Sequence, residues 1–402
     1  LRRQGPGSPT LKRLAELRRR AIVPVLAVFT AIVLGGILIV LTDFDHLQHI
    51  GTDPLGSIGG ALGAMVEAYA AMLSGGIGDP GRIVTAVQSG NARDIAFAIR
   101  PITETLLAAT PFIFGGLAAA VAFRTGLFNL GLDGQFLIGG LGAAVATVLL
   151  AGSLPPFLIL LVGLVVGTLS GAAYGFLPGL LKARTGAHEV LTTLMLNMIA
   201  SQIAMLVLRS GNFGKVLTPI AAVPRIFDLR TIRLDWGFVA ALVMTAVISF
   251  VLFRTTLGFE LRATGFSRSA ARSVGMAPGR TTILGLTLSG GLAGMGSAFV
   301  TLGPAGQFAP SGVGFVALAL ALIGGLRPSG VALAALLYGV LDNGASTMGI
   351  VSGIPLALIV VIIALVMMFV AAPSLTRMIW RLGPPEPAAT PTLAPPDAPA
   401  TV

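Results

Sequence analysis

The chain has 402 residues, of which 55% are hydrophobic and only 10% are charged, with a mean hydropathy of +0.92. Soluble globular proteins carry roughly 25% charged residues, so this composition excludes a water-soluble body and predicts a membrane protein throughout. The chain has no cysteine, which excludes disulfides and thiolate metal sites. Its three histidines are too scattered for a metal site, so no metal is expected. The net charge is +10, and the basic residues cluster beside apolar stretches, as the positive-inside rule requires. This distribution predicts no nucleic-acid binding.

The first element is a basic leader at residues 1–20, followed directly by an apolar run at 21–41. The pair resembles a signal peptide. The apolar run is long for one, however, and no small-residue cleavage site follows it. We therefore predict a retained first span with a cytoplasmic leader.

Residues 42–103 are Gly-rich and punctuated by aspartates, which predicts a largely extracytoplasmic or interfacial region. Apolar runs follow at 105–123, 135–151, 156–181, 189–208, 236–253, 281–302, 313–326, 331–346 and 354–372. Each is expected to be helical, because any other backbone in hydrocarbon leaves polar groups unpaired. The segment 313–346 is either two tilted spans or a re-entrant hairpin.

These runs predict an all-α integral membrane protein with about ten transmembrane helices in a transmembrane domain at 21–372. Most of the 26 Lys and Arg residues then fall in segments on the side of the leader, so both termini are expected in the cytoplasm. Residues 373–402 form a Pro- and Ala-rich cytoplasmic tail that is expected to be disordered from Gly383 onward.

An internal similarity suggests an inverted 5+5 repeat. The sequence GGLAAAVAF at 115–123 precedes GLDGQF at 131–136, and GGLAGMGSAFV at 290–300 precedes GPAGQF at 303–308. Many transporters place their path between such halves. Chance similarity is the alternative, because small-residue runs are common in membrane helices.

A polar, Gly-rich stretch at 124–135 lies between two apolar runs. An acid that faces lipid is costly, so Asp133 is expected to face a cavity, a partner or water. The alternative is an ordinary cytoplasmic turn with a snorkelling Arg124. We predict a translocation path lined by Phe128, Asn129, Asp133 and Gln135 of this stretch, together with Asn197 and Asp342.

Two of these candidates have plainer interpretations. Asn197 can instead join two helices by hydrogen bonding, and Asp342 can lie at an outer helix end. Glu189 is expected to pair with Lys182 or Arg184.

The basic loop at 254–280 carries apolar residues at spacings of three and four, with arginines on another face. A short amphipathic cytoplasmic helix of this kind can dock on a soluble partner or attach to the membrane surface. The residues expected to make the contact are Phe259, Arg262, Phe266, Arg268, Ala270 and Arg272.

The chain contains no phosphate-binding loop of the G-x-x-x-x-G-K-[ST] type, no H-E-x-x-H and no G-x-S-x-G. No catalytic residue is therefore predicted, and ATP hydrolysis by this chain is not expected.

Four blocks in order resemble the permease subunits of ABC importers, in the simple-sugar/nucleoside group of the branched-chain amino acid/ribose permease superfamily. They are GLFNLGLDGQFLIGG at 126–140, HEVLTTLMLN at 188–197, LRATG through to GM at 261–276, and LSGGLAGMG at 288–296. The resemblance departs from the family pattern at His188, where Asn is usual, at Asp133, where Glu is usual, and at Val316, where an Asp is usual.

This resemblance implies an importer permease in the bacterial inner (plasma) membrane that carries a nucleoside or, next, a simple sugar. It implies a second permease subunit (a heterodimer is favoured), a cytoplasmic ABC ATPase that uses ATP and Mg, and an extracytoplasmic substrate-binding lipoprotein. The loop 254–280 resembles the coupling helix that receives the ATPase's movement. No cofactor is expected on this chain itself. The alternative is a secondary transporter driven by protons or sodium, with Asp133 as the ion carrier.

Overall fold

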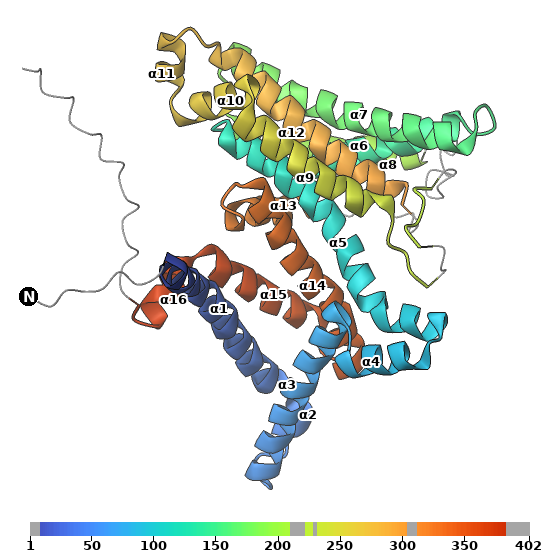
Figure 1. Cartoon of the computed structure of the whole chain (residues 1–402), viewed down its shortest axis with the longest axis vertical. Coiled ribbons are helices and arrows are strands. Elements are labelled where there is room, and N and C mark those ends of the chain that lie inside the picture. The colour runs from blue at the N-terminus through green and yellow to red at the C-terminus, as the bar shows by residue number, and fades with distance from the viewer. Residues whose placement is uncertain (1–8, 210–221, 228–230, 304–311, 383–402) are drawn as a thin grey trace, which may run out of the picture. The chain divides into compact units, whose positions relative to one another are not determined.

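The computed structural model describes residues 9–209, 222–227, 231–303 and 312–382 (Figure 1). Within these ranges the chain is helical, with no strand and a single antiparallel bridge between Arg225 and Asp235. The helices divide into two compact units. One unit comprises residues 1–35 and 364–402, and the other comprises residues 36–363.

The smaller unit contains most of α1 (Pro9–Thr42), the end of α15 (Leu356–Ala371) and α16 (Pro373–Ile379). Trp380 joins two of these helices, because its indole Nε1 donates to Thr30 Oγ1 at 2.9 Å and its ring lies 5.9 Å from that of Phe29. The expected start of the leader and the tail beyond Leu382 lie outside the described residues.

The larger unit begins with α2 (Phe44–Leu47), α3 (Pro54–Ile77), α4 (Pro80–Ser89) and α5 (Ala92–Arg124), and continues with α6 (Leu132–Leu149), α7 (Pro156–Thr185) and α8 (Glu189–Arg209). Then come α9 (Trp236–Arg254), α10 (Thr256–Phe266), α11 (Arg268–Ser273), α12 (Pro278–Thr301), α13 (Val313–Ile323) and α14 (Pro328–Ser352). A proline opens α3, α4, α7, α12 and α14. Proline at this position lacks only an N–H that has no helical partner anyway.

Nine described helices are long and apolar enough to cross a membrane, or ten if the bent pair α15 and α16 counts as one. This confirms the prediction of an all-α protein with about ten spans. The helix α3, in the region expected to be extracytoplasmic or interfacial, also satisfies the length and composition of a crossing helix. The orientation of the termini stays a prediction. So does the internal repeat, whose second copy runs into residues outside the described part.

The helix α13 is too short to cross alone. Its 11 residues rise about 16 Å, roughly half of the hydrocarbon core. The following helix α14 has 25 residues and is long and apolar enough to cross, so the segment matches neither two complete spans nor a hairpin of two short helices: it pairs a half-length helix with a full-length one.

A seam of glycines joins α7 to α12, which run side by side with α6 and α9 in Figure 1. Gly167, Gly171 and Gly175 recur every four residues on α7 and meet Gly290 and Gly294 of α12 backbone to backbone. Small residues at this spacing allow membrane helices to approach closely. This seam fixes α12, whose last turn contributes to the cavity described next.

Candidate functional site

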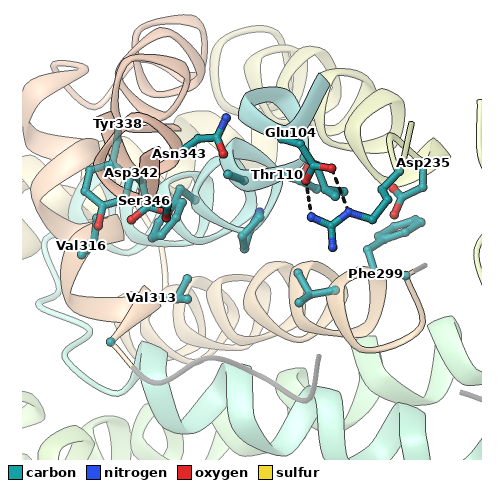
Figure 2. A pocket seen from close by; sticks show the side chains of 18 residues that line it. Glu104, Thr110, Asp235, Phe299, Val313, Val316, Tyr338, Asp342, Asn343 and Ser346 are labelled. Atoms are coloured by element: carbon teal, nitrogen blue, oxygen red, sulfur yellow. Dashed lines mark hydrogen bonds and ion pairs between the residues drawn. The ribbon is translucent and has the colours of Figure 1, made fainter. Parts of the chain in front are cut away.

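A cavity of about 550 Å³ opens among α5, the segment before α9, the end of α12, the start of α13 and α14 (Figure 2). Pockets of this size are typical of small-molecule sites. The helix α5 contributes Thr110, Pro111 and Phe112 to the wall. A proline inside a helix cannot donate to the carbonyl four residues earlier, so Pro111 leaves the carbonyl of Leu107, another wall residue, without its helical partner.

The helix α14 contributes Tyr338, Asp342 and Ser346, which recur every four residues and therefore share one face. Figure 2 places these three side chains together at one end of the cavity. The ring of Tyr338 meets that of Phe112 edge to face, with centroids 4.5 Å apart. This end of the cavity thus combines hydroxyls, a carboxylate and an aromatic pair.

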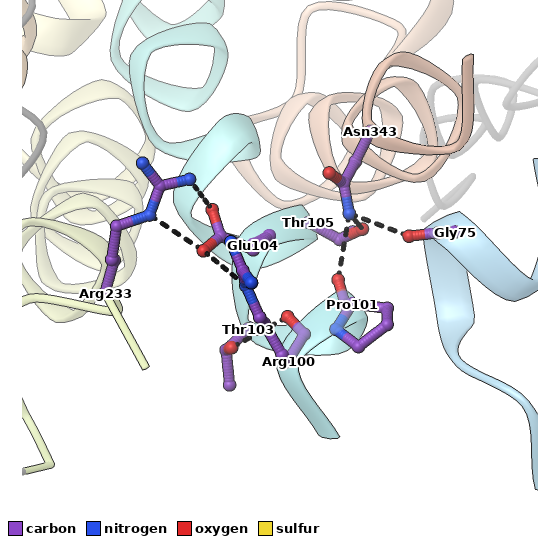
Figure 3. Close-up of polar contacts among 8 residues, drawn as sticks. All are labelled: Gly75, Arg100, Pro101, Thr103, Glu104, Thr105, Arg233 and Asn343. Atoms are coloured by element: carbon purple, nitrogen blue, oxygen red, sulfur yellow. Dashed lines mark hydrogen bonds and ion pairs between the residues drawn. The ribbon is translucent and has the colours of Figure 1, made fainter. Parts of the chain in front are cut away.

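Asn343 anchors the α14 wall to its neighbours (Figure 3). Its Nδ2 lies 2.9 Å from the carbonyl oxygen of Gly75, 3.0 Å from that of Pro101 and 3.1 Å from Thr105 Oγ1. Thr105 Oγ1 in turn donates to the carbonyl of Gly76 at 2.6 Å. These bonds join α3, α5 and α14 and fix the register of Asp342 on the cavity wall.

The opposite end of the cavity carries an ion pair between Glu104 of α5 and Arg233 of the segment before α9 (Figures 2 and 3). The guanidinium donates from Nε to Oε1 at 2.8 Å and from Nη2 to Oε2 at 2.6 Å, a bidentate geometry. Arg100 Nε lies 3.7 Å from the same carboxylate. The hydrogen bonds that the Arg233 guanidinium donates to Glu104 raise the pKa of this guanidinium above its usual value.

Asp235 lies beside this ion pair and caps α9. Its Oδ1 accepts from the backbone N–H of Gly237 at 2.7 Å, which satisfies one of the unpaired donors of the first turn. The side chain is buried. Burial raises the pKa of its carboxyl to about 6, although the N–H groups of Gly237 and Phe238 act in the opposite direction.

Residues 102–371 match the family described as the permease component of branched-chain amino acid transport systems. The chain belongs to this family. The resemblance inferred from the four sequence blocks is thereby confirmed, and the chain is a transport-system permease. All the helices that form the cavity lie almost wholly within the matched region.

The permease is 32% identical over 290 residues to a guanosine ABC transporter permease protein of Bacillus subtilis, covering 69% of this chain and 83% of the relative. It is 33% identical over 290 residues to a nucleoside ABC transporter permease protein of Lactococcus lactis, covering 68% and 79%. It is 28% identical over 292 residues to a glucose ABC transporter permease protein of Haloferax volcanii, covering 67% and 75%.

The polar, Gly-rich stretch at 124–135, which we call the polar hairpin, takes part in a buried hydrogen-bond network. The side-chain amides of Asn129 and Gln135 bond reciprocally at 2.8 and 3.2 Å, and Asn129 Nδ2 also donates to Ser289 Oγ at 2.8 Å. Asn197 Oδ1 accepts from the N–H of Gly134 at 2.8 Å, and its Nδ2 donates to the carbonyl of Leu130 at 2.7 Å. The two Asn197 bonds satisfy one carbonyl of the turn between α5 and α6 and one N–H of the first turn of α6.

Asp133 Oδ1 accepts from the N–H groups of Gly312 at 3.1 Å and Gly314 at 2.8 Å, so this carboxylate caps the start of α13. Phe128 is largely exposed and its ring lies 5.1 Å from that of Phe123. Of the six path candidates, only Asp342 lines the cavity, and Asn129, Gln135, Asn197 and Asp133 bond within the protein. A path role for the hairpin stays a prediction.

The loop 254–280 forms two helices instead of one. Ser267 ends α10 and its side chain caps α11 by accepting from the N–H of Ala270 at 3.3 Å, which breaks the expected continuous helix. Phe266 is 95% exposed, Phe259 is also exposed, and Arg268, Ala270 and Arg272 face outward beside them. Arg262 is half-buried, with its guanidinium 5.2 Å from the ring of Phe253.

The same end of the larger unit gathers basic groups assigned to cytoplasmic segments. Arg124 Nε donates to the carbonyl of Leu326 at 3.1 Å, and its guanidinium shares the ring of Phe253 with Arg262. Lys182 pairs with Glu189, which confirms the pairing expected from the sequence.

Several cavity residues were missed by sequence reasoning. Glu104 lies just outside the predicted run at 105–123, and Arg233 and Asp235 lie between the predicted runs at 189–208 and 236–253. The signal that could have found part of the site is the spacing of Tyr338, Asp342 and Ser346, because polar groups every four residues in an apolar run mark one face.

Proposed function

We propose that this permease forms part of the transmembrane path of an ABC importer and carries nucleosides, with simple sugars as the next candidate. The observation that carries the proposal is the cavity, which combines an aromatic pair with hydroxyl, amide and carboxylate groups. A nucleoside has an aromatic base whose face suits aromatic contact and a sugar that requires hydrogen bonds. The solutes named for the relatives, guanosine, nucleosides and glucose, all carry several hydroxyls.

The transport energy comes from a separate cytoplasmic ABC ATPase, which binds the ATP and Mg. Two helices, α10 and α11, carry the exposed residues Phe259, Phe266, Arg268, Ala270 and Arg272. Exposed phenylalanines and arginines of this kind suit the groove of such a partner, because they combine apolar burial with charge steering. A second permease, unlike this one, completes the path. An extracytoplasmic binding lipoprotein delivers the solute at the bacterial plasma membrane.

The test is uptake by the assembled importer in proteoliposomes that enclose ATP and Mg. Labelled guanosine is added outside together with the binding protein. The proposal expects accumulation that persists when ionophores collapse proton and sodium gradients and that stops when a non-hydrolysable analogue replaces ATP. Accumulation that follows an imposed ion gradient without ATP would overturn it, and so would the absence of uptake of every nucleoside and sugar tried.

A further inference from the structure

One carboxylate in the cavity wall has no hydrogen-bond or ion-pair partner among the residues that the structure describes. Asp342 makes no hydrogen bond or ion pair with any described residue. The other acids at the cavity are engaged, since Glu104 pairs with Arg233 and Asp235 caps α9. An ionised carboxylate accepts hydrogen bonds on two oxygens and donates none, so Asp342 offers two free acceptor atoms to whatever enters.

The surroundings of Asp342 favour a solute that brings two hydrogen-bond donors to this carboxylate. Asn343, the next residue, uses its amide Nδ2 for three contacts with α3 and α5, so it does not supply donors to the cavity. Tyr338 and Ser346 lie one helical turn to either side of Asp342 on the same face. The cation of the described cavity wall, Arg233, is paired with Glu104, which Figure 2 places away from Asp342.

We infer that Asp342 binds a vicinal pair of hydroxyls on the solute, with the aromatic pair of Tyr338 and Phe112 next to it in contact with the solute's ring. Two adjacent O–H groups match the two oxygens of one carboxylate, and an acidic side chain on ribose hydroxyls is a recurrent solution in nucleotide-binding proteins. This inference rests on the proposed function. It adds that the permease itself, and not only the binding protein, selects for a diol.

The alternative ligand for the same carboxylate is the donor edge of a base. Guanine offers two adjacent N–H donors, whereas the glucose named for one relative offers none. Vicinal hydroxyls are the chemistry that nucleosides and sugars share, and they are therefore the better match to Asp342.

The experiment compares guanosine, 2′-deoxyguanosine and 2′,3′-dideoxyguanosine as cargo of the assembled importer. Uptake is measured with wild-type permease, Asp342→Asn and the control Asp94→Asn, which neutralises an exposed acid at the start of α5 away from the cavity. The same binding protein serves all three, so its own preference cancels when the ratios of uptake are compared. Loss of a hydrogen bond to a charged group changes a rate by about tenfold or more.

The expected result is a preference of wild type and Asp94→Asn for guanosine over the dideoxy analogue, and a fall of that preference by about tenfold in Asp342→Asn. Equal preferences in all three proteins would overturn the inference. So would a variant that alters only the discrimination between guanosine and inosine, which differ in the base edge. If wild type moves neither a nucleoside nor a simple sugar, the proposed function has failed instead.

Asp342→Glu covers the case in which Asp342→Asn does not assemble. It keeps the charge but moves the carboxylate by one methylene, and the preference for the diol is again expected to fall. An unchanged preference in Asp342→Glu, with normal assembly by size-exclusion chromatography, would count against the geometry proposed here.

Discussion

The glycine seam between α7 and α12 allows a stability prediction with a built-in control. A Cβ on Gly171 would lie 2.4 Å from the carbonyl oxygen of Gly290 and 2.7 Å from the Cα of Gly294. Both contacts are with backbone, which no rotamer change can move away. We therefore expect Gly171→Ala to force α7 and α12 apart.

The size of the effect follows from comparison with Gly63→Ala. Gly63 lies inside α3 with nothing within 4 Å of its would-be Cβ. Both substitutions replace a helix-interior glycine and gain the same helix propensity, about 1 kcal/mol. The difference between them isolates the overpacking cost, which is about 1–3 kcal/mol.

The assay is denaturant unfolding of the purified permease in mixed micelles, monitored by far-UV circular dichroism. Gly63→Ala is expected to be neutral or stabilising and Gly171→Ala to be the less stable of the two by the stated amount. Gly171→Val should be worse than Gly171→Ala, because its branched side chain is larger. Equal stability of Gly63→Ala and Gly171→Ala would refute the close approach of the two helices.

The remaining predictions concern the cavity and the exposed loop. In a double-mutant cycle, Glu104→Gln and Arg233→Gln should each lower the free energy of unfolding, with a coupling energy of about 1–2 kcal/mol between them. This value lies between those of surface and buried ion pairs, because the Arg233 side chain is 40% exposed. Additive effects would show that the pair contributes nothing to stability. The pKa of Asp235 is raised to about 6, so the folded state holds its proton more tightly than the unfolded one, and stability should fall as pH rises from about 4 to 6. Asp235→Asn, which can still cap α9, should flatten that slope in pH-dependent unfolding, and an unaltered slope would exclude Asp235 as its source. Phe266→Asp should leave the free energy of unfolding unchanged, because this side chain is 95% exposed, but it should reduce at least tenfold the stimulation of the ATPase by solute-loaded binding protein. Full stimulation would exclude this surface from coupling. Arg272→Glu provides a second check by reversing a charge.

Sequence reasoning identified most helices because an apolar run of about 20 residues is a local signal. It also identified the pairing of Lys182 with Glu189, since both flank one short turn. Sequence reasoning did not predict α3 as a possible crossing helix, because its repeated glycines lower the mean hydropathy of the segment. Two of these glycines serve helix packing. Gly75 and Gly76 there meet Thr347 and Val340 of α14.

The cavity could not be read from the sequence because its wall combines segments far apart in the chain. Glu104 and Arg233 meet across 129 positions, and no local pattern announces that pairing. The hairpin shows the opposite difficulty. The sequence correctly marked Asn129 and Gln135 as unusual polar residues between spans, but it could not show that each would satisfy the other within the protein.

The partners of the acidic side chains provide the strongest argument for where a solute passes. A carboxylate at membrane depth is costly unless it is paired, hydrogen-bonded or in contact with water. Asp133 is compensated by two backbone N–H groups of α13, Glu189 by Lys182, and Glu104 by Arg233. Asp342 has no such compensation from the described residues, yet it lies in the wall of a cavity large enough for a small solute. We attribute its stabilisation to what fills that cavity, which is water in the empty state and, under our proposal, donor groups of the cargo in transit. A role in transport then explains this acid more readily than a role in folding does.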